Sequence, residues 1–168
     1  MQSDIKLFGG IDAVALAANS KNPHELFAAV DQYAFSFLRQ SLCTVNRFDA
    51  ARQRVVRLYS SNPAAYPVGG SKDKAGTPWG KHVLLERRIF VGEGAASIRE
   101  SFDDFEAIRA LGLQSVINVP VVARDTCLGT INFLMREPGI QPGKLQCAQL
   151  AALLATPGFM VLPGQEGN

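Results

Sequence analysis

Two nearly continuous apolar segments, separated by a short polar stretch, constrain the fold of this chain more than any other feature. Residues 115–122 read SVINVPVV, and residues 127–135 read CLGTINFLM. The polar residues 124–126 between them favour a turn, so the two segments are predicted to form an antiparallel hairpin. Because neither strand alternates apolar and polar residues, both faces of this hairpin must be covered by other parts of the chain.

Two segments with helical character lie toward the two ends of the chain. Residues 22–25 read NPHE, in which Asn22 suits an N-cap and Pro23 suits the first turn of a helix. Apolar residues then recur at helical spacing, which predicts a helix over roughly residues 23–39. An alanine- and leucine-rich run predicts a second helix over residues 145–154.

The middle of the chain predicts a second hairpin and a set of covering segments. Strands over 42–48 and 54–61 flank a turn-rich stretch, and a long irregular stretch follows from residue 62 to residue 76. A helix start at 77–80, a short strand at 88–91 and a helix at 103–111 come next. This order predicts an α+β fold: a central antiparallel sheet of about five to six strands, with the terminal helices on one face. Loops and short helices of residues 62–114 cover the other face.

Composition excludes several classes of function. The chain has 168 residues, of which 47% are hydrophobic and 19% charged, and this suits one packed domain. Its net charge of +2 is too balanced to predict a nucleic-acid or membrane partner. No apolar run approaches the roughly 20 residues of a membrane span, and the first residues carry no export signal. Three cysteines without a CxxC motif indicate reduced thiols, so we expect a cytoplasmic protein.

Three segments together resemble the GAF domain, a small-molecule-sensing module. They are residues 79–91 (WGKHVLLERRIFV), 111–121 (LGLQSVINVPV) and 128–133 (LGTINF), and their order and spacing fit the family. The resemblance covers roughly residues 22–156, which leaves 1–21 as an N-terminal segment and 157–168 as a C-terminal tail. It implies a ligand pocket under the middle loops and a homodimer formed through the terminal helices.

Asn118 and Asn132 interrupt the two apolar strands of the hairpin at residues 115–135, where amides are uncommon. A three-residue turn at 124–126 places them directly opposite each other, whereas a turn of two or four residues places them on opposite faces. Buried amides need hydrogen-bond partners. These two are therefore either ligand-binding residues or a structural amide pair.

Five further side chains gather around the long middle stretch. Apolar pockets with a few hydroxyl or indole donors are typical of small-molecule sites, although aromatic residues also serve as plain core. Trp79 stands out, because it is the only tryptophan and its N–H needs a partner when buried. The ligand-binding residues predicted here are Tyr59, Ser61, Tyr66, Trp79 and Phe90.

Charged residues of the middle section have two interpretations each. The basic residues Lys72, Lys74, Lys81, Arg87 and Arg88 suit an anionic ligand or, as the favoured interpretation, a solvated loop. Asp103 and Asp104 suit a cationic ligand group or, again favoured, a helix N-terminus, where acidic residues complement the helix dipole.

No catalytic or metal-binding pattern is recognisable. His24 and His82 lie far apart in sequence without a carboxylate or cysteine cluster, which argues against a metal site. One GAF branch reduces free methionine sulfoxide with cysteines in its pocket loops, but Cys43, Cys127 and Cys147 fall in predicted strands and a helix. The bilin-attaching branch also needs a cysteine in those loops.

The sequence therefore predicts a stand-alone, non-catalytic sensor or regulatory domain that binds a small molecule. It identifies neither the ligand nor a cofactor. The alternatives are a thiol-dependent methionine sulfoxide reductase and an adaptor domain whose pocket is filled by its own side chains.

Overall fold

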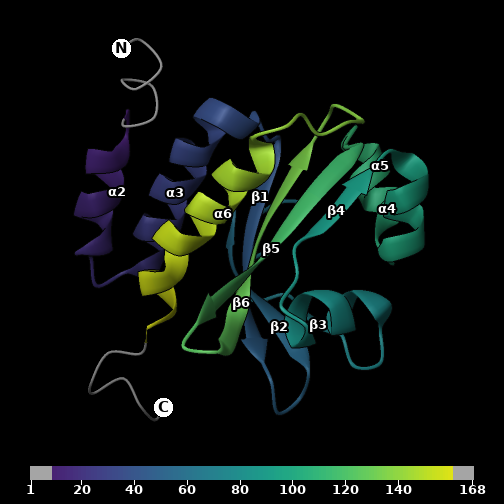
Figure 1. Cartoon of the computed structure of the whole chain (residues 1–168), viewed down its shortest axis with the longest axis horizontal. Helices are drawn as coiled ribbons and strands as arrows, with labels where there is room; N and C mark the ends of the chain where they lie inside the picture. Colours follow the sequence, from purple (N-terminus) through teal and green to yellow (C-terminus); the bar gives the residue numbers. More distant parts are fainter. Residues whose placement is uncertain (1–8, 161–168) are drawn as a thin grey trace.

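A computed structural model describes residues 9–160, and at its centre lies an antiparallel sheet (Figure 1). Six strands in the described part form this sheet, in the order β3-β2-β1-β6-β5-β4. The order joins the two predicted hairpins through β1 and β6, which are far apart in the sequence. The strands are β1 (Leu42–Asp49), β2 (Arg54–Ser60), β3 (Ser71–Asp73), β4 (Phe90–Glu93), β5 (Ser115–Ala123) and β6 (Thr126–Met135).

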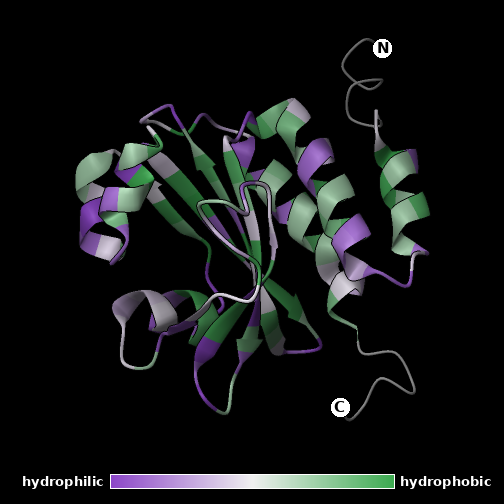
Figure 2. Ribbon diagram, turned by 180° about the vertical axis from the view of Figure 1, so that it is seen from behind, coloured by the Kyte–Doolittle hydropathy of each residue, from purple (hydrophilic) through white to green (hydrophobic). Residues whose placement is uncertain are grey.

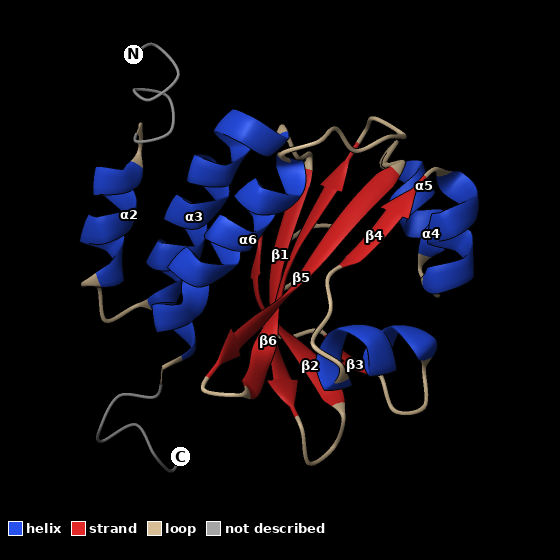
Figure 3. Cartoon of the chain, in the orientation of Figure 1, coloured by secondary structure: helices blue, strands red, loops and turns tan. Residues whose placement is uncertain are grey.

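Helices cover both faces of the sheet, as Figure 3 shows. On one face lie α2 (Ile11–Ala18), α3 (Pro23–Leu38), α6 (Lys144–Ala155) and the short 3-10 helix η2 (Thr156–Phe159). On the other lie a π-helix, η1 (Gly80–Leu85), and the short helices α4 (Ala95–Ser101) and α5 (Phe105–Ala110). The predicted fold class, an α+β sheet with terminal helices on one face and the middle segments on the other, is confirmed.

Helix α3 begins where the sequence predicts. The Asn22 side-chain oxygen accepts a hydrogen bond from the His24 backbone N–H at 3.1 Å, and Pro23 occupies the first turn. The helix ends at Arg39, whose left-handed backbone (φ 54°) stops it. Its buried stripe includes Leu26 and Val30, which face the sheet.

The main core fills the space between the sheet and helices α3 and α6. Phe27, Val30, Ile131 and Phe133 are all within 1% of full burial. Figure 2 shows the central strands coloured largely as hydrophobic, which fits their coverage on both faces. At Gly129, an added Cβ would collide with the Asn46 carbonyl oxygen, so only glycine permits this close approach of β6 to β1.

The turn between β5 and β6 differs from the three-residue turn on which the predicted pairing rested. It has two residues, Arg124 and Asp125, both with positive φ (49° and 61°). Leu128 is left unpaired in a bulge, because Val122 pairs with Cys127 and Val121 pairs with Gly129. The bulge restores the register that the shorter turn would have shifted, so Asn118 does lie opposite Asn132.

A second bulge lies in β2. Tyr59 pairs with Val45 and Arg57 pairs with Asn46, which leaves Leu58 without a partner. The extra residue reverses the alternation of side chains beyond it. Arg57 and Tyr59 therefore point to opposite faces of the sheet, although they are two residues apart.

Three segments differ from the sequence prediction in detail. The stretch from 62 to 76 is not wholly irregular, because Ser71–Asp73 form an edge strand against residues 54–56. Helix α4 was not predicted, and the predicted strand at 88–91 begins and ends two residues later, as β4. Short polar elements of this kind depend on the strands beside them rather than on their own apolar pattern.

The predicted N-terminal segment (1–21) and C-terminal tail (157–168) lie partly outside the described residues. Within them, α2 packs against α3 through the buried Val14, and Phe159 of η2 packs on the ring of Phe27. The division at residues 22 and 156 stays a prediction. None of the helices described between residues 9 and 160 has the length and apolarity needed to cross a membrane.

Candidate ligand-binding site

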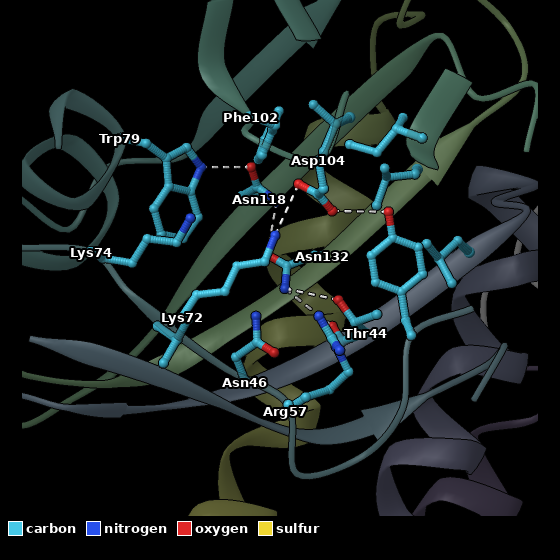
Figure 4. A pocket seen from close by; sticks show the side chains of 17 residues that line it. Thr44, Asn46, Arg57, Lys72, Lys74, Trp79, Phe102, Asp104, Asn118 and Asn132 are labelled. Carbon is cyan, nitrogen blue, oxygen red and sulfur yellow. Dashed lines mark hydrogen bonds and ion pairs between the residues drawn. The ribbon is translucent and has the colours of Figure 1, made fainter. Parts of the chain in front are cut away.

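A cavity lies between the sheet and its middle-segment cover, on the face opposite α3 and α6 (Figure 4). Strands β1, β2, β5 and β6 supply its floor, and residues 66–79 and 102–108 supply its walls. Its empty volume is about 610 Å³ including the open mouth. That space suits several waters or a small organic molecule.

A continuous chain of buried hydrogen bonds crosses the floor of this cavity. The Trp79 indole Nε1 donates to Asn118 Oδ1 at 2.9 Å, and Asn118 Nδ2 donates to Asn132 Oδ1 at 2.8 Å. Asn132 Nδ2 in turn donates to the hydroxyl oxygens of Thr44 and Thr130, both at 3.1 Å. Each of the five residues is at most 7% exposed. We call these five residues the amide ladder.

The sheet register explains why the ladder forms. Asn132 lies opposite Asn118 of β5 on one side and opposite Thr44 of β1 on the other, so three adjacent strands present these side chains at one level. Trp79 reaches the ladder from the start of η1, where it packs beside Val55 and Val83. Every buried amide oxygen of the ladder thus has a donor.

Asp104 joins two walls of the cavity. Its carboxylate accepts a hydrogen bond from the Tyr66 hydroxyl at 3.0 Å and lies 2.9 Å from Lys72 Nζ. Burial alone would raise the pKa of Asp104, but the Lys72 ammonium and the Tyr66 hydroxyl outweigh it and hold that pKa below its usual value. The favoured capping role is corrected here, because the Asp104 side chain makes no cap hydrogen bond to α5 and instead closes the cavity wall.

Two further cations line the cavity against aromatic rings. The Arg57 guanidinium lies 5.0 Å from the Tyr66 ring centroid, and Lys74 Nζ lies 4.8 Å from that of Trp79. Burial lowers the pKa of both side chains, and the neighbouring Lys72 charge lowers that of Lys74 further. The favoured interpretation of Lys72 and Lys74 as part of a solvated loop is therefore wrong, since both are half-buried cavity residues.

A larger cleft adjoins the cavity. Its empty volume is about 1250 Å³ including open solvent, and Phe90 and His82 are among its lining residues. Trp79 and Phe102 line both the cavity and this cleft. These two side chains therefore form the partition between the two spaces.

Comparison with solved structures shows which fold this is. The GAF domain of a phosphoenolpyruvate-protein phosphotransferase from Acinetobacter matches with a TM-score of 0.70 at 20% identity, over 94% of this chain and 93% of that one. The corresponding domain from Coxiella burnetii gives a TM-score of 0.70 at 14% identity, over 91% and 92%. The chain has the GAF fold.

A third GAF structure, the phycocyanobilin-bound domain of a cyanobacterial phytochrome, matches with a TM-score of 0.66 at 12% identity, over 93% of this chain and 92% of that one. The TM-scores establish the fold, and the low identities leave the ligand open. No model of a known protein family matches the chain, and no curated protein matches it either.

Within the GAF fold, four of the seven predicted site residues line the cavity, namely Tyr66, Trp79, Asn118 and Asn132. Phe90 lines the adjoining cleft instead. The β2 bulge turns Tyr59 to the helix face, where its hydroxyl donates to Asp31 at 2.6 Å. Ser61 lies just after β2, and its hydroxyl accepts from the Cys43 backbone N–H at 2.9 Å.

Six polar or charged cavity residues were not among the predicted site residues: Thr44, Asn46, Arg57, Lys72, Lys74 and Asp104. The two lysines and Asp104 were noted for their charge alone. An alternation rule counted from the β1–β2 turn pairs Arg57 correctly with Asn46, but it would place Tyr59 on the same face, because the bulge lies between the two residues. Thr44 could be assigned to the site only from the pairing of β1 with β6, which joins residues 88 positions apart.

None of the three cysteines lines the cavity of this GAF fold. Cys43 is fully buried on the helix face, and burial raises the pKa of its thiol well above the usual value. Burial also raises the pKa of Cys127 and of Cys147. Thiols held in the protonated form are poor nucleophiles, which disfavours the reductase alternative.

Proposed function

We propose that this chain is a non-catalytic GAF-type sensor or regulatory domain that binds a small molecule in the cavity between the sheet and residues 66–79 and 102–108. The observation that carries the proposal is the cavity itself, with the amide ladder along its floor. Among solved structures, the phytochrome GAF domain with bound phycocyanobilin supports a ligand-binding use of this fold. The proposal includes a cytoplasmic location, because the thiols are unpaired.

The chemistry of the cavity favours a ligand over a pocket filled by the protein's own side chains. A filled pocket would satisfy its buried polar groups internally. Here the Arg57 Nε is buried without any acceptor among the described residues. The space beside it also remains open to small molecules. An external ligand would supply the hydrogen-bond acceptor for Arg57 Nε that the surrounding side chains do not supply.

The segment of residues 62–87 could couple ligand binding to the helices on the far face, because it forms much of the cavity wall. Residues 62–87 supply Tyr66, Lys72, Lys74 and Trp79 to the cavity, so ligand contacts act directly on this segment. We expect binding to order it and to bias the packing of the helices on the far face through the sheet. Equal amide hydrogen-exchange protection of 62–87 with and without ligand would contradict this coupling.

A homodimer through α3 and α6 is the second part of the proposal. Leu153 on α6 is 67% exposed and Phe35 on α3 is 42% exposed, so both helices carry uncovered apolar side chains. Leu16 on the neighbouring α2 is 75% exposed, which extends the same helical layer. Exposed apolar side chains on packed helices support a two-fold interface between copies of the chain.

The test is a native mass spectrum of the freshly purified, untagged protein. A mass above that of the chain by the mass of a small molecule supports ligand binding, and the same spectrum reports monomer or dimer. The Asn132→Leu variant, which breaks the ladder, should lose the added mass. The Tyr59→Phe variant, altered on the opposite face, should keep it. A bare monomer in every preparation contradicts both parts of the proposal.

A further inference from the structure

The cationic side chains of the cavity outnumber its acidic ones. Arg57, Lys72 and Lys74 all line it, whereas Asp104 is the only carboxylate among the lining residues. Lys72 is paired with Asp104 at 2.9 Å. Arg57 and Lys74 make no ion pair within 4 Å among residues 9–160 and lie over aromatic rings instead, although Asp104 is near enough to raise the pKa of both. The cavity therefore holds two more positive charges than negative ones.

The two unpaired cations are also partly removed from water. Arg57 donates one hydrogen bond, from a terminal NH₂ group to the Pro67 carbonyl oxygen at 3.1 Å, and its Nε is buried without an acceptor. Burial lowers the pKa of Arg57 and of Lys74, which means that their charged forms are under-solvated. A buried cation of this kind is stabilised by an anion beside it.

The remaining hydrogen-bonding capacity of the cavity consists mainly of donors. Asn118 Oδ1 already accepts from Trp79, Asn132 Oδ1 accepts from Asn118, and both Asp104 oxygens are engaged. Asn118 Nδ2 uses one of its two hydrogens, and the Arg57 Nε–H is unused. A ligand that complements this set must bring acceptors.

The opposite wall of the cavity is apolar. Leu42, Phe102, Ile108, Val116 and Leu134 line it, and all five belong to a second hydrophobic cluster between the sheet and helices α4 and α5. Figure 4 shows the three cationic side chains, Arg57, Lys72 and Lys74, which come from β2, β3 and the residues just after β3. The cavity is thus cationic on one side and apolar on the other.

From these observations we infer that the ligand is a small organic anion, a carboxylate or phosphate group on a short apolar body. Its anionic group is bound by Arg57 and Lys74, and its apolar body packs against the wall around Leu42 and Phe102. The inference rests on the proposed function, because it names the ligand class of the same cavity. Arg57 supplies paired N–H donors that suit either oxyanion.

The test compares four probes of similar size and different charge: benzoate, phenyl phosphate, neutral benzamide and protonated benzylamine. Binding is followed by ¹H–¹⁵N NMR through the Trp79 indole and the Asn118 and Asn132 side-chain amides. We expect the two anions to shift these signals with at least about tenfold higher affinity than benzamide. Benzylamine should shift none of them. The ratio of benzoate to phenyl phosphate affinity distinguishes the two anionic groups.

Variants test whether Arg57 and Lys74 bind the anionic group. Arg57→Met and Lys74→Met keep the aliphatic stems over the two rings, and each should weaken benzoate or phenyl phosphate binding by about tenfold or more. Arg54→Met, on the same strand outside the cavity, and Lys81→Met, 73% exposed, are the matched controls and should leave affinity unchanged.

The outcomes separate the two proposals. Benzamide or benzylamine binding at the same signals as tightly as the anions overturns the anion inference and leaves the small-molecule cavity in place. If no probe shifts the Trp79, Asn118 and Asn132 signals at millimolar concentration, both proposals fail. The comparison of the four probes uses only the wild-type protein, so a poorly folding Arg57→Met protein does not weaken the test.

Discussion

The hydrogen bond from Trp79 to Asn118 joins the cover of the cavity to its floor, and a double-mutant cycle should measure it. The Trp79→Phe change removes the indole N–H and keeps an aromatic ring. Asn118 is 3% exposed, and no other described group donates to its Oδ1. The change therefore leaves a buried carbonyl oxygen without a donor.

The expected magnitudes follow from the contacts. A buried acceptor left unsatisfied costs about 1–3 kcal/mol, and the smaller ring adds about 1 kcal/mol of lost apolar burial. Trp79→Phe should thus lower the free energy of unfolding by about 2–4 kcal/mol. Asn118→Val, which loses its bonds to Trp79 and Asn132, should cost a similar amount. In the double variant the two costs should overlap by about 1 kcal/mol, the net value of one such hydrogen bond.

The assay is urea unfolding of the four proteins followed by far-ultraviolet circular dichroism, since Trp79→Phe removes the only tryptophan. Trp79→Phe combined with Tyr59→Phe is the control cycle, because Tyr59 lies on the opposite face of the sheet and should be additive. A Trp79–Asn118 coupling energy within about 0.5 kcal/mol of zero would refute the claim that this bond links cover and floor.

Three further predictions concern the interface, the pH dependence and the partition. Leu153→Glu should convert the proposed dimer to a monomer in size-exclusion chromatography with light scattering, whereas Leu85→Glu, 54% exposed on the other layer, should not. The lowered pKa of Asp104 stabilises the fold fully above its unfolded value of about 3.9, and this contribution disappears as pH falls through the folded value. The stability difference between the wild type and Asp104→Asn should therefore shrink in urea titrations toward about pH 3, and a constant difference contradicts the assignment. Phe102→Ala should cost about 1–3 kcal/mol and join the cavity to the outer cleft, which should tighten binding of 2-naphthoate relative to benzoate; unchanged relative affinities argue against a partition.

Apolar periodicity and turn chemistry were enough to predict the layers of this molecule. The helix at Pro23–Leu38 and the hairpin strands at Leu42–Asp49 and Arg54–Ser60 lie within two residues of their predicted bounds. Local signals succeeded because each long element buries a continuous apolar surface, and such a surface requires a recognisable pattern. The short elements β3 and α4 carry no such surface and escaped prediction.

Asn118 lies opposite Asn132 as predicted, but the structural cause differs from the predicted three-residue turn. A two-residue turn would have separated the two amides, and the unpaired Leu128 restored their alignment. A bulge cannot be predicted by a rule of strict alternation. Tyr59 was assigned to the site because it lies beside the long middle stretch, but the bulge at Leu58 turns it to the helix face.

By itself, the sequence determined the longer strands of the sheet, the terminal helices that cover it and where the two central amides lie along their strands, because these depend on neighbours a few residues away. Only the tertiary structure decided which charges share the cavity. Arg57, Lys74 and Asp104 come from separate segments, and the packing of the middle segments onto the sheet brings them to one space. Their charge balance depends on distances between segments far apart in sequence, and those distances are set by how the whole chain packs.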